Sequence, residues 1–301
     1  MKSFRFILTL TAVFVLAVTA AQGQNARTWV SGAGSDSNPC TRLSPCLTFQ
    51  GAYAKTTVGG EIDALDDGEF GTVTITNSIT IDGGSHLAAI SSGVSSYGIY
   101  VAAPAGSTIT LRNLSIRNSA SAKFGVRALN QVYTLHIEHC VISGFSGDGI
   151  FVGPGQAAAI NFYLDDSIIR DNETGVNLVG GVTANISNSH LLGNYEVGFD
   201  GSGYGLNLAM TNSEISGSLY GFSFYAVDAP TSTASIANSV VANNQYGVLA
   251  RGADAAVTLS NVSLFNNTTA GISIFDGAVV TSFQNNANTG TGTPSNSTVL
   301  R

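Results

Sequence analysis

The chain has 301 residues, of which only 10% are charged, while 35 are Gly and 24 are Asn. Average globular proteins carry about 25% charged residues and about 7% Gly. The 44% hydrophobic share excludes a disordered chain, and the presence of only 6 Pro excludes collagen. Long soluble helices are disfavoured because their wet face needs Glu, Lys and Arg. The composition predicts short buried strands joined by tight turns.

Residues 1–23 have the pattern of a secretory signal peptide. Lys2 and Arg5 precede an apolar run over residues 6–18, and small residues near Gly23 offer cleavage sites. A membrane anchor is the alternative, but the run is short for a spanning helix. We therefore expect a secreted protein, extracellular or periplasmic, with no membrane contact after cleavage.

The charge that follows the leader restricts the partners. Ten of the 12 basic residues and all 19 acidic residues lie after position 23, which leaves a net charge of −9. Such a chain lacks the basic footprint that binds phosphate backbones, so nucleic acid is not expected as a partner. A polyanion is also disfavoured unless cations bridge it to the protein. We expect a monomer.

A repeat of about 25 residues dominates the chain. Each repeat starts with a Gly, an apolar residue, a variable residue and often a second apolar residue, and these glycines lie 23 to 27 residues apart. The anchor glycines are Gly98, Gly125, Gly149, Gly175, Gly198, Gly221, Gly247 and Gly271. Two further short strands follow in each repeat, and the turns between strands are too short for helices. The pattern predicts an all-β chain whose three-strand coils stack about 4.8 Å apart as a parallel β-helix over residues 61–285.

Period-2 alternation assigns the faces of these strands. The residues one and three places after each anchor glycine are expected to point inward. The middle strand ends in Asn or Asp, which is expected to form an outer ladder from coil to coil. The small residue that follows is expected inside, in a stack of Cys140, Ser167, Ser189, Ser213 and Ser239. Cys140 is then a buried structural thiol rather than a nucleophile.

Both ends of such a solenoid need covers, because they expose strand edges and core. Residues 47–55 can form a short amphipathic helix with Phe49 and Ala52 on one side. We expect this helix to cap the first coil within residues 24–60, fastened by a disulfide between Cys40 and Cys46. The polar tail, residues 286–301, is expected to cover the other end.

The entry segment resembles a known family. The stretch from Thr48 to Tyr53, the Gly68-Glu-Phe70 turn and the strand pattern ending in Asp82-Gly83 are similar to the start of pectin-lyase-like right-handed β-helix proteins. The Asn38-Pro39-Cys40 and Pro45-Cys46 opening resembles that of secreted bacterial members. The resemblance implies a single-stranded right-handed parallel β-helix. It implies no single activity, because the family includes pectate lyases, polygalacturonases, alginate epimerases and phage tailspikes.

In that family the sites lie on the outer face of the Gly-anchored sheet. The column two places after each anchor glycine reads Tyr100, Arg127, Phe151, Asn177, Asp200, Ser223, Leu249 and Ser273. A lyase needs Ca²⁺-binding carboxylates beside an Arg or Lys base, and a polygalacturonase-like hydrolase needs several Asp with a nearby His. Neither set is complete, since Arg127 and Asp200 are separated by three coils, roughly 14 Å.

Acidic residues gather at the edge of this face. Glu173 and Glu196 lie two residues before their anchors in adjacent coils, so they stack about 5 Å apart, with Asp148, Asp171 and Asp200 close by. One interpretation is a catalytic group of Glu173, Glu196 and Asp200, or a Ca²⁺ site of Asp171, Glu173 and Glu196. The alternative is a solvated loop edge with splayed side chains.

A second acid pair, Asp228 and Asp254, lies at the opposite border with Arg251 nearby. An ordinary surface ion pair is the simpler interpretation there.

Exposed rings point to sugar binding. Tyr220 and Tyr246 directly precede anchor glycines in adjacent coils, as do Tyr97 and Phe124. Outward rings are also expected at Tyr100, Phe151, Tyr225 and Phe275. Regularly spaced rings can stack on sugar rings, although they can also merely stabilise the coils. The residues we expect to contact a glycan are Tyr100, Arg127, Phe151, Asn177, Tyr220, Tyr225 and Tyr246.

Three functions remain open from the sequence. The favoured one is a secreted protein that binds extracellular polysaccharide or cell-surface material without a complete catalytic set. The second is a polysaccharide lyase or glycoside hydrolase that uses the acidic edge, with Ca²⁺ as its conceivable cofactor. The third is a structural component of an envelope or matrix.

Overall fold

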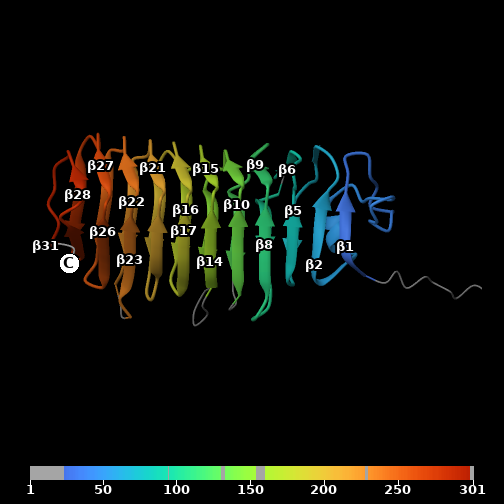
Figure 1. The fold of residues 1–301 in the computed structure, drawn as a ribbon, viewed down its shortest axis with the longest axis horizontal. Helices are drawn as coiled ribbons and strands as arrows, with labels where there is room; N and C mark the ends of the chain where they lie inside the picture. The colour runs from blue at the N-terminus through green and yellow to red at the C-terminus, as the bar shows by residue number, and fades with distance from the viewer. Residues whose placement is uncertain (1–23, 94, 130–132, 154–159, 228–229, 299–301) are drawn as a thin grey trace, which may run out of the picture.

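The computed structural model describes residues 24–93, 95–129, 133–153, 160–227 and 230–298. The predicted signal peptide lies outside these residues. The described chain is a solenoid whose coils follow one another along the long axis, from β1 at the N-terminal end to β31 at the C-terminal end (Figure 1). No helix among the described residues is both long and apolar enough to cross a bilayer.

Three sheets of parallel strands form the sides of the solenoid, and each coil adds one strand to each sheet. The twelve-stranded sheet contains β1 (Asn25–Val30), β2 (Thr56–Ala64), β5 (Ile79–Asp82), β8 (Thr108–Arg112), β11 (Thr134–Glu138), β14 (Ile160–Asp165), β17 (Val182–Ser187), β20 (Asn207–Thr211), β23 (Ser232–Ala237), β26 (Ala255–Ser260), β29 (Val279–Phe283) and β31 (Asn296–Thr298). The nine-stranded sheet contains β4 (Val73–Ile75), β7 (Tyr97–Val101), β10 (Phe124–Leu129), β13 (Asp148–Gly153), β16 (Thr174–Val179), β19 (Val197–Ser202), β22 (Tyr220–Tyr225), β25 (Tyr246–Arg251) and β28 (Ala270–Phe275). The ten-stranded sheet contains β3 (Gly68–Glu69), β6 (Ala88–Ser91), β9 (Leu114–Arg117), β12 (Val141–Ser143), β15 (Ile168–Arg170), β18 (His190–Leu192), β21 (Glu214–Ser216), β24 (Val240–Ala242), β27 (Ser263–Phe265) and β30 (Ala287–Asn288). The predicted three-strand coil is confirmed.

The anchor glycines lie near the start of each strand of the nine-stranded sheet, where successive coils approach closely. A Cβ on Gly175 would lie 2.4 Å from the carbonyl oxygen of Gly198, and one on Gly125 would lie 2.4 Å from that of Gly149. Contacts this short are not found for real Cβ atoms, so only glycine fits. The glycine repeat in the sequence therefore marks the positions where successive coils come into contact.

The core is a continuous apolar cluster inside the three sheets. The predicted inner stack is confirmed, because Cys140, Ser167, Ser189, Ser213 and Ser239 are all buried. Each serine hydroxyl accepts from the backbone N–H of the equivalent residue one coil earlier, as Ser189 does from Ser167. Burial raises the pKa of the Cys140 thiol to about 12, which fits a structural role.

Two asparagine ladders run along the solenoid. The predicted outer one is present in part, since Asn212 donates to Asn188 and Asn261 donates to Asn238. These residues have φ near +50°, so the left-handed turn is a second reason for Asn there. An inner ladder was not predicted: buried Asn172 donates to buried Asn194 at 3.0 Å.

The helix expected over residues 47–55 forms as α2, from Phe49 to Tyr53, and buries Phe49 and Ala52. The side chains of Gln50 and Tyr53 accept hydrogen bonds from the backbone of residues 74 and 76, at the edge of the nine-stranded sheet. Its role as an end cap stays a prediction. The predicted disulfide between Cys40 and Cys46 is present.

Parallel pairing extends past the predicted coil limits at both ends. β1, which precedes residue 61, pairs with β2, and β31, which follows residue 285, pairs with β29. Pairing depends on backbone groups, so polar strands can join a sheet without a hydrophobic pattern that would predict them.

Replacing an anchor glycine should displace a whole coil. We expect Gly175→Ala to lower the urea midpoint of unfolding by an amount equivalent to about 2–3 kcal/mol, because the added methyl overlaps the Gly198 carbonyl. Circular dichroism during urea denaturation measures this. Gly32→Ala is the control, since its Cβ would meet no atom closer than 3.5 Å. Equal midpoints for both variants would contradict the close-contact explanation.

Candidate functional site

The predicted outward column on the nine-stranded sheet is present in full. Strand register pairs its members one coil at a time, from Tyr100 with Arg127 to Leu249 with Ser273. The intermediate pairs follow the same register through Phe151, Asn177, Asp200 and Ser223. The column therefore forms one straight row along the solenoid.

The N-terminal part of this face is aromatic with one cation. Tyr97 stacks on Tyr100 with ring centres 5.0 Å apart, and the Phe124 and Phe151 rings meet edge-on at 5.9 Å. The Arg127 guanidinium lies 4.7 Å from the centre of the Phe124 ring. Its Nε is buried without a hydrogen-bond partner, and among the described residues no carboxylate lies within 4.0 Å of Arg127. This part of the face therefore presents aromatic rings and a guanidinium that has no ion-pair partner among the described residues.

The middle of the face is polar and acidic. Asn177 donates to both carboxylate oxygens of Asp148 at 3.4 Å, and Asp200 is the register partner of Asn177 in the next strand. Burial raises the pKa of Asp148 to about 6, with smaller contributions from the charges of Asp200 and Glu173. Burial also raises the pKa of Asp200, although the Ser223 hydroxyl opposes the rise. Protonatable acids therefore occupy the centre of the face.

The acidic edge brings two of its predicted residues together. The backbone N–H of Glu196 donates to the Glu173 carbonyl at 3.0 Å. Desolvation, then the hydrogen bond and like charge of Glu173, raise the pKa of the Glu196 carboxyl. The stacked pair is therefore confirmed. Asp171 is exposed and forms an ion pair with Arg170.

A different acidic group meets the geometric criterion for a metal. Among the described residues, the group of three with ligand atoms within 4.8 Å of one another is Glu61, Asp63 and Asp82 on the twelve-stranded sheet. Arg27 is bound to Asp63, and Arg112 bridges Asp82 at 2.8 Å and Glu61 at 3.0 Å. Hydrogen bonds, including one from Arg112, hold the pKa of Asp82 below its usual value despite partial burial. These arginines already neutralise the group. The predicted Ca²⁺ site at Asp171, Glu173 and Glu196 stays a prediction.

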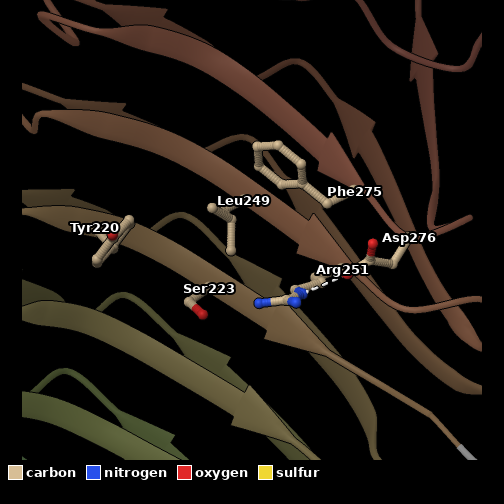
Figure 2. Close-up of a pocket in the computed structure, with 6 residues that line it drawn as sticks. All are labelled: Tyr220, Ser223, Leu249, Arg251, Phe275 and Asp276. Atoms are coloured by element: carbon tan, nitrogen blue, oxygen red, sulfur yellow. Dashed lines mark hydrogen bonds and ion pairs between the residues drawn. The ribbon is translucent and has the colours of Figure 1, made fainter.

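The C-terminal part of the face contains a pocket of about 410 Å³. Its lining residues come from β22, β25, β28 and the turn after β28: Tyr220, Ser223, Leu249, Arg251, Phe275 and Asp276. Figure 2 shows Leu249 between Tyr220 and Phe275, with the Arg251–Asp276 pair along one border. Tyr220 also stacks on Tyr246 with ring centres 5.2 Å apart.

The Arg251 guanidinium is held from two sides. Its Nε donates to the Asp276 carboxylate at 2.6 Å, and it lies 5.8 Å from the centre of the Tyr225 ring. The sequence suggested the Asp228 and Asp254 pair as its acidic neighbours. The structure gives Asp276 instead, while Asp228 lies outside the described residues.

The predicted binding residues thus separate into two groups on one face. Tyr100, Arg127, Phe151 and Asn177 occupy four successive coils. Farther along, Tyr220 lines the pocket, Tyr246 stacks on Tyr220, and Tyr225 lies against Arg251. The sequence places Leu249 and Phe275 on the outer face and Phe275 among the rings that could stack on sugars, but neither is among the predicted glycan-contacting residues. Asp276 was missed, because it follows the strand on a turn.

Comparisons with known proteins agree with this architecture. The family model described as right handed beta helix region matches residues 59–215 and 97–288. The structure of a pectate lyase aligns with a TM-score of 0.59 and 13% identity, over 91% of this chain and 80% of that one. A rhamnogalacturonan lyase aligns with a TM-score of 0.55 and 11% identity, over 82% of this chain and 75% of that one. No curated protein sequence matches the chain significantly.

These matches define the protein class. The solenoid has the fold seen in polysaccharide lyases, and at such low identities the structural likeness shows the fold alone. The family match covers most of the chain, so the chain belongs to the right-handed β-helix family. The handedness implied by the sequence resemblance is confirmed.

The raised pKa of Asp148 predicts a pH-dependent stability. Because the folded-state pKa of about 6 exceeds the ordinary 3.8, the ionised carboxylate destabilises the fold above about pH 6, and this cost disappears below about pH 4. We expect Asp148→Asn to stabilise the protein by about 1–3 kcal/mol near pH 8 and by little near pH 4.

Thermal melts followed by circular dichroism at both pH values provide the measurement. Asp166→Asn is the control, because Asp166 is an exposed acid whose φ of 44° suits Asn. A gain for Asp148→Asn that is the same at both pH values would refute the burial of an ionised carboxylate.

Proposed function

We propose that this chain binds polysaccharide along the outer face of the nine-stranded sheet, without cleaving it. The observation that carries the proposal is the pocket formed by three coils at the end of a straight row of outward side chains. Its rings, Tyr220 and Phe275, flank an apolar floor at Leu249, and Ser223 supplies a hydroxyl. Sugar-binding surfaces combine ring faces with a few polar groups in this way.

The extended shape of the face suits a chain ligand better than a small molecule. The aromatic group near Tyr100 and the pocket near Tyr220 lie on one sheet, several coils apart in unbroken register. A linear polymer could contact both, and each contact would raise the effective concentration for the other. The fold shared with a pectate lyase and a rhamnogalacturonan lyase supports this ligand class.

Export is part of the proposal. The leader pattern in residues 1–23 would direct the chain to an oxidising compartment, and the Cys40–Cys46 disulfide is a bond that persists there. A polysaccharide outside the cytoplasm would then be within reach.

The stacked tyrosines should be needed for binding. We expect Tyr220→Ala combined with Tyr246→Ala to weaken polysaccharide binding at least about tenfold, since two rings at the pocket are lost. Affinity electrophoresis against a panel of plant and microbial polysaccharides measures this. The matched control is His136→Ala combined with Tyr163→Ala, which removes a stacked pair, 4.7 Å apart, from the twelve-stranded sheet. If the two double variants weaken binding equally, the pocket is not the binding site.

Catalysis is the second candidate function, favoured by the protonatable group of Asp148, Asp200 and the Glu173–Glu196 pair. The binding proposal predicts no bond cleavage, because the unpaired Arg127 lies three coils from Asp200. Incubation with pectate, alginate and xylan, with and without Ca²⁺, tests this by ultraviolet absorbance of unsaturated ends and by new reducing ends. Products that disappear in Glu196→Gln and Asp200→Asn would establish the enzyme instead.

A further inference from the structure

The charges around the pocket determine which sugars it can accept. Arg251 is the cation in its wall, and that guanidinium is already bound to Asp276 at 2.6 Å. The Tyr225 ring covers it from another direction. The Nε of Arg251 is the group bound to Asp276, so a sugar carboxylate or sulfate could reach only the terminal N–H groups of the guanidinium. There it would lie beside the Asp276 carboxylate, whose like charge would offset the new ion pair.

The coil before the pocket adds negative charge beside it. Ser223 in the pocket wall is the register partner of Asp200 in the preceding strand. Glu196 precedes that same strand and is stacked on Glu173. An anionic ligand lying along the sheet would approach these carboxylates, and among the described residues the unpaired cation of the sheet, Arg127, lies several coils away.

The other residues of the pocket wall are uncharged. Tyr220, Leu249 and Phe275 contribute ring and apolar surface, and the Ser223 hydroxyl can donate or accept a hydrogen bond. Uncharged sugar rings offer C–H faces and hydroxyl groups, which match these partners without desolvating a charge.

We infer that the pocket formed by β22, β25 and β28 receives an uncharged sugar residue and discriminates against uronates and sulfated sugars. This inference rests on the proposed function and specifies its substrate class. The Arg251–Asp276 pair serves as a positioning element: it holds the pocket border and keeps a carboxylate beside the cation, which disfavours acidic ligands.

Matched polymers that differ only in charge test the selectivity. The first pair is fully methyl-esterified and de-esterified homogalacturonan, and the second is hydroxyethylcellulose and carboxymethylcellulose. For at least one pair, affinity electrophoresis of the full-length mature protein in Ca²⁺-free buffer should show binding to the uncharged polymer that is at least about tenfold tighter. Because the discrimination is repulsive, added salt should raise the affinity for the acidic polymer and leave that for the uncharged one nearly constant.

The opposite salt response overturns the inference. Tighter binding to the acidic polymers, weakening as salt rises, would show a cationic site while leaving polysaccharide binding intact. If the protein binds no member of either pair and no polysaccharide of the wider panel, the proposed function is refuted as well.

Asp276→Asn tests the positioning element directly. Asp276 has φ of 53°, a conformation that Asn adopts readily, so the backbone should be retained while Arg251 is freed. The ratio of acidic to uncharged polymer affinity should rise at least about fivefold. Glu69→Gln is the control, because it frees Arg117 on the ten-stranded sheet from a similar ion pair. A ratio that does not change in Asp276→Asn, or that rises equally in both variants, contradicts the assigned role.

Discussion

The close approach of successive coils at the anchor glycines is the constraint on which the rest of the structure depends. At Gly149 and Gly198 an added Cβ would lie 2.8 and 2.7 Å from the carbonyl oxygen of the next anchor. Since every coil meets the next at the same point, the register of the nine-stranded sheet cannot slip without breaking this contact. The buried serine and asparagine ladders repeat the same condition on other sides of the coil, because each backbone N–H they satisfy belongs to a neighbouring coil.

Fixed register converts sequence spacing into surface geometry. A residue two places after each anchor glycine must lie beside its equivalents, so chemically unrelated side chains such as Phe151, Asn177 and Asp200 form one row. The same geometry brings Glu173 and Glu196 together in adjacent coils, where desolvation, then the hydrogen bond and like charge of Glu173, raise the pKa of Glu196. Low overall charge is therefore a structural requirement of this face as well as a property of the composition.

The sequence allowed the fold, the outward row and the inner serine stack to be predicted, because all three repeat with the coil. The sequence placed Asp148 close to Glu173 and Asp200, and the charges of both act on it. Its contact with Asn177 was harder to predict, because strict alternation fails at Gly149: Gly149 and Ile150 are both buried, so Asp148 points outward together with Phe151. The Arg251–Asp276 pair was missed for another reason: Asp276 lies on a turn with φ of 53°, where no strand period applies. The repeat predicts the positions that all coils have in common. The chemistry of the pocket instead depends on side chains that occur in only three coils.

The location of the pocket at the C-terminal end of the sheet follows from the same architecture. In a solenoid each coil contacts mainly its neighbours, so three adjacent coils can carry unusual side chains without disturbing the others. β28 is the last strand of the nine-stranded sheet, and Phe275 at its end is 51% exposed because no further strand of that sheet follows. Arg251 and Asp276 bridge the last two coils at this border. The ion pair there stabilises the exposed end of the sheet. Because Asp276 neutralises the guanidinium, aromatic rings and the Ser223 hydroxyl are left to recognise the ligand.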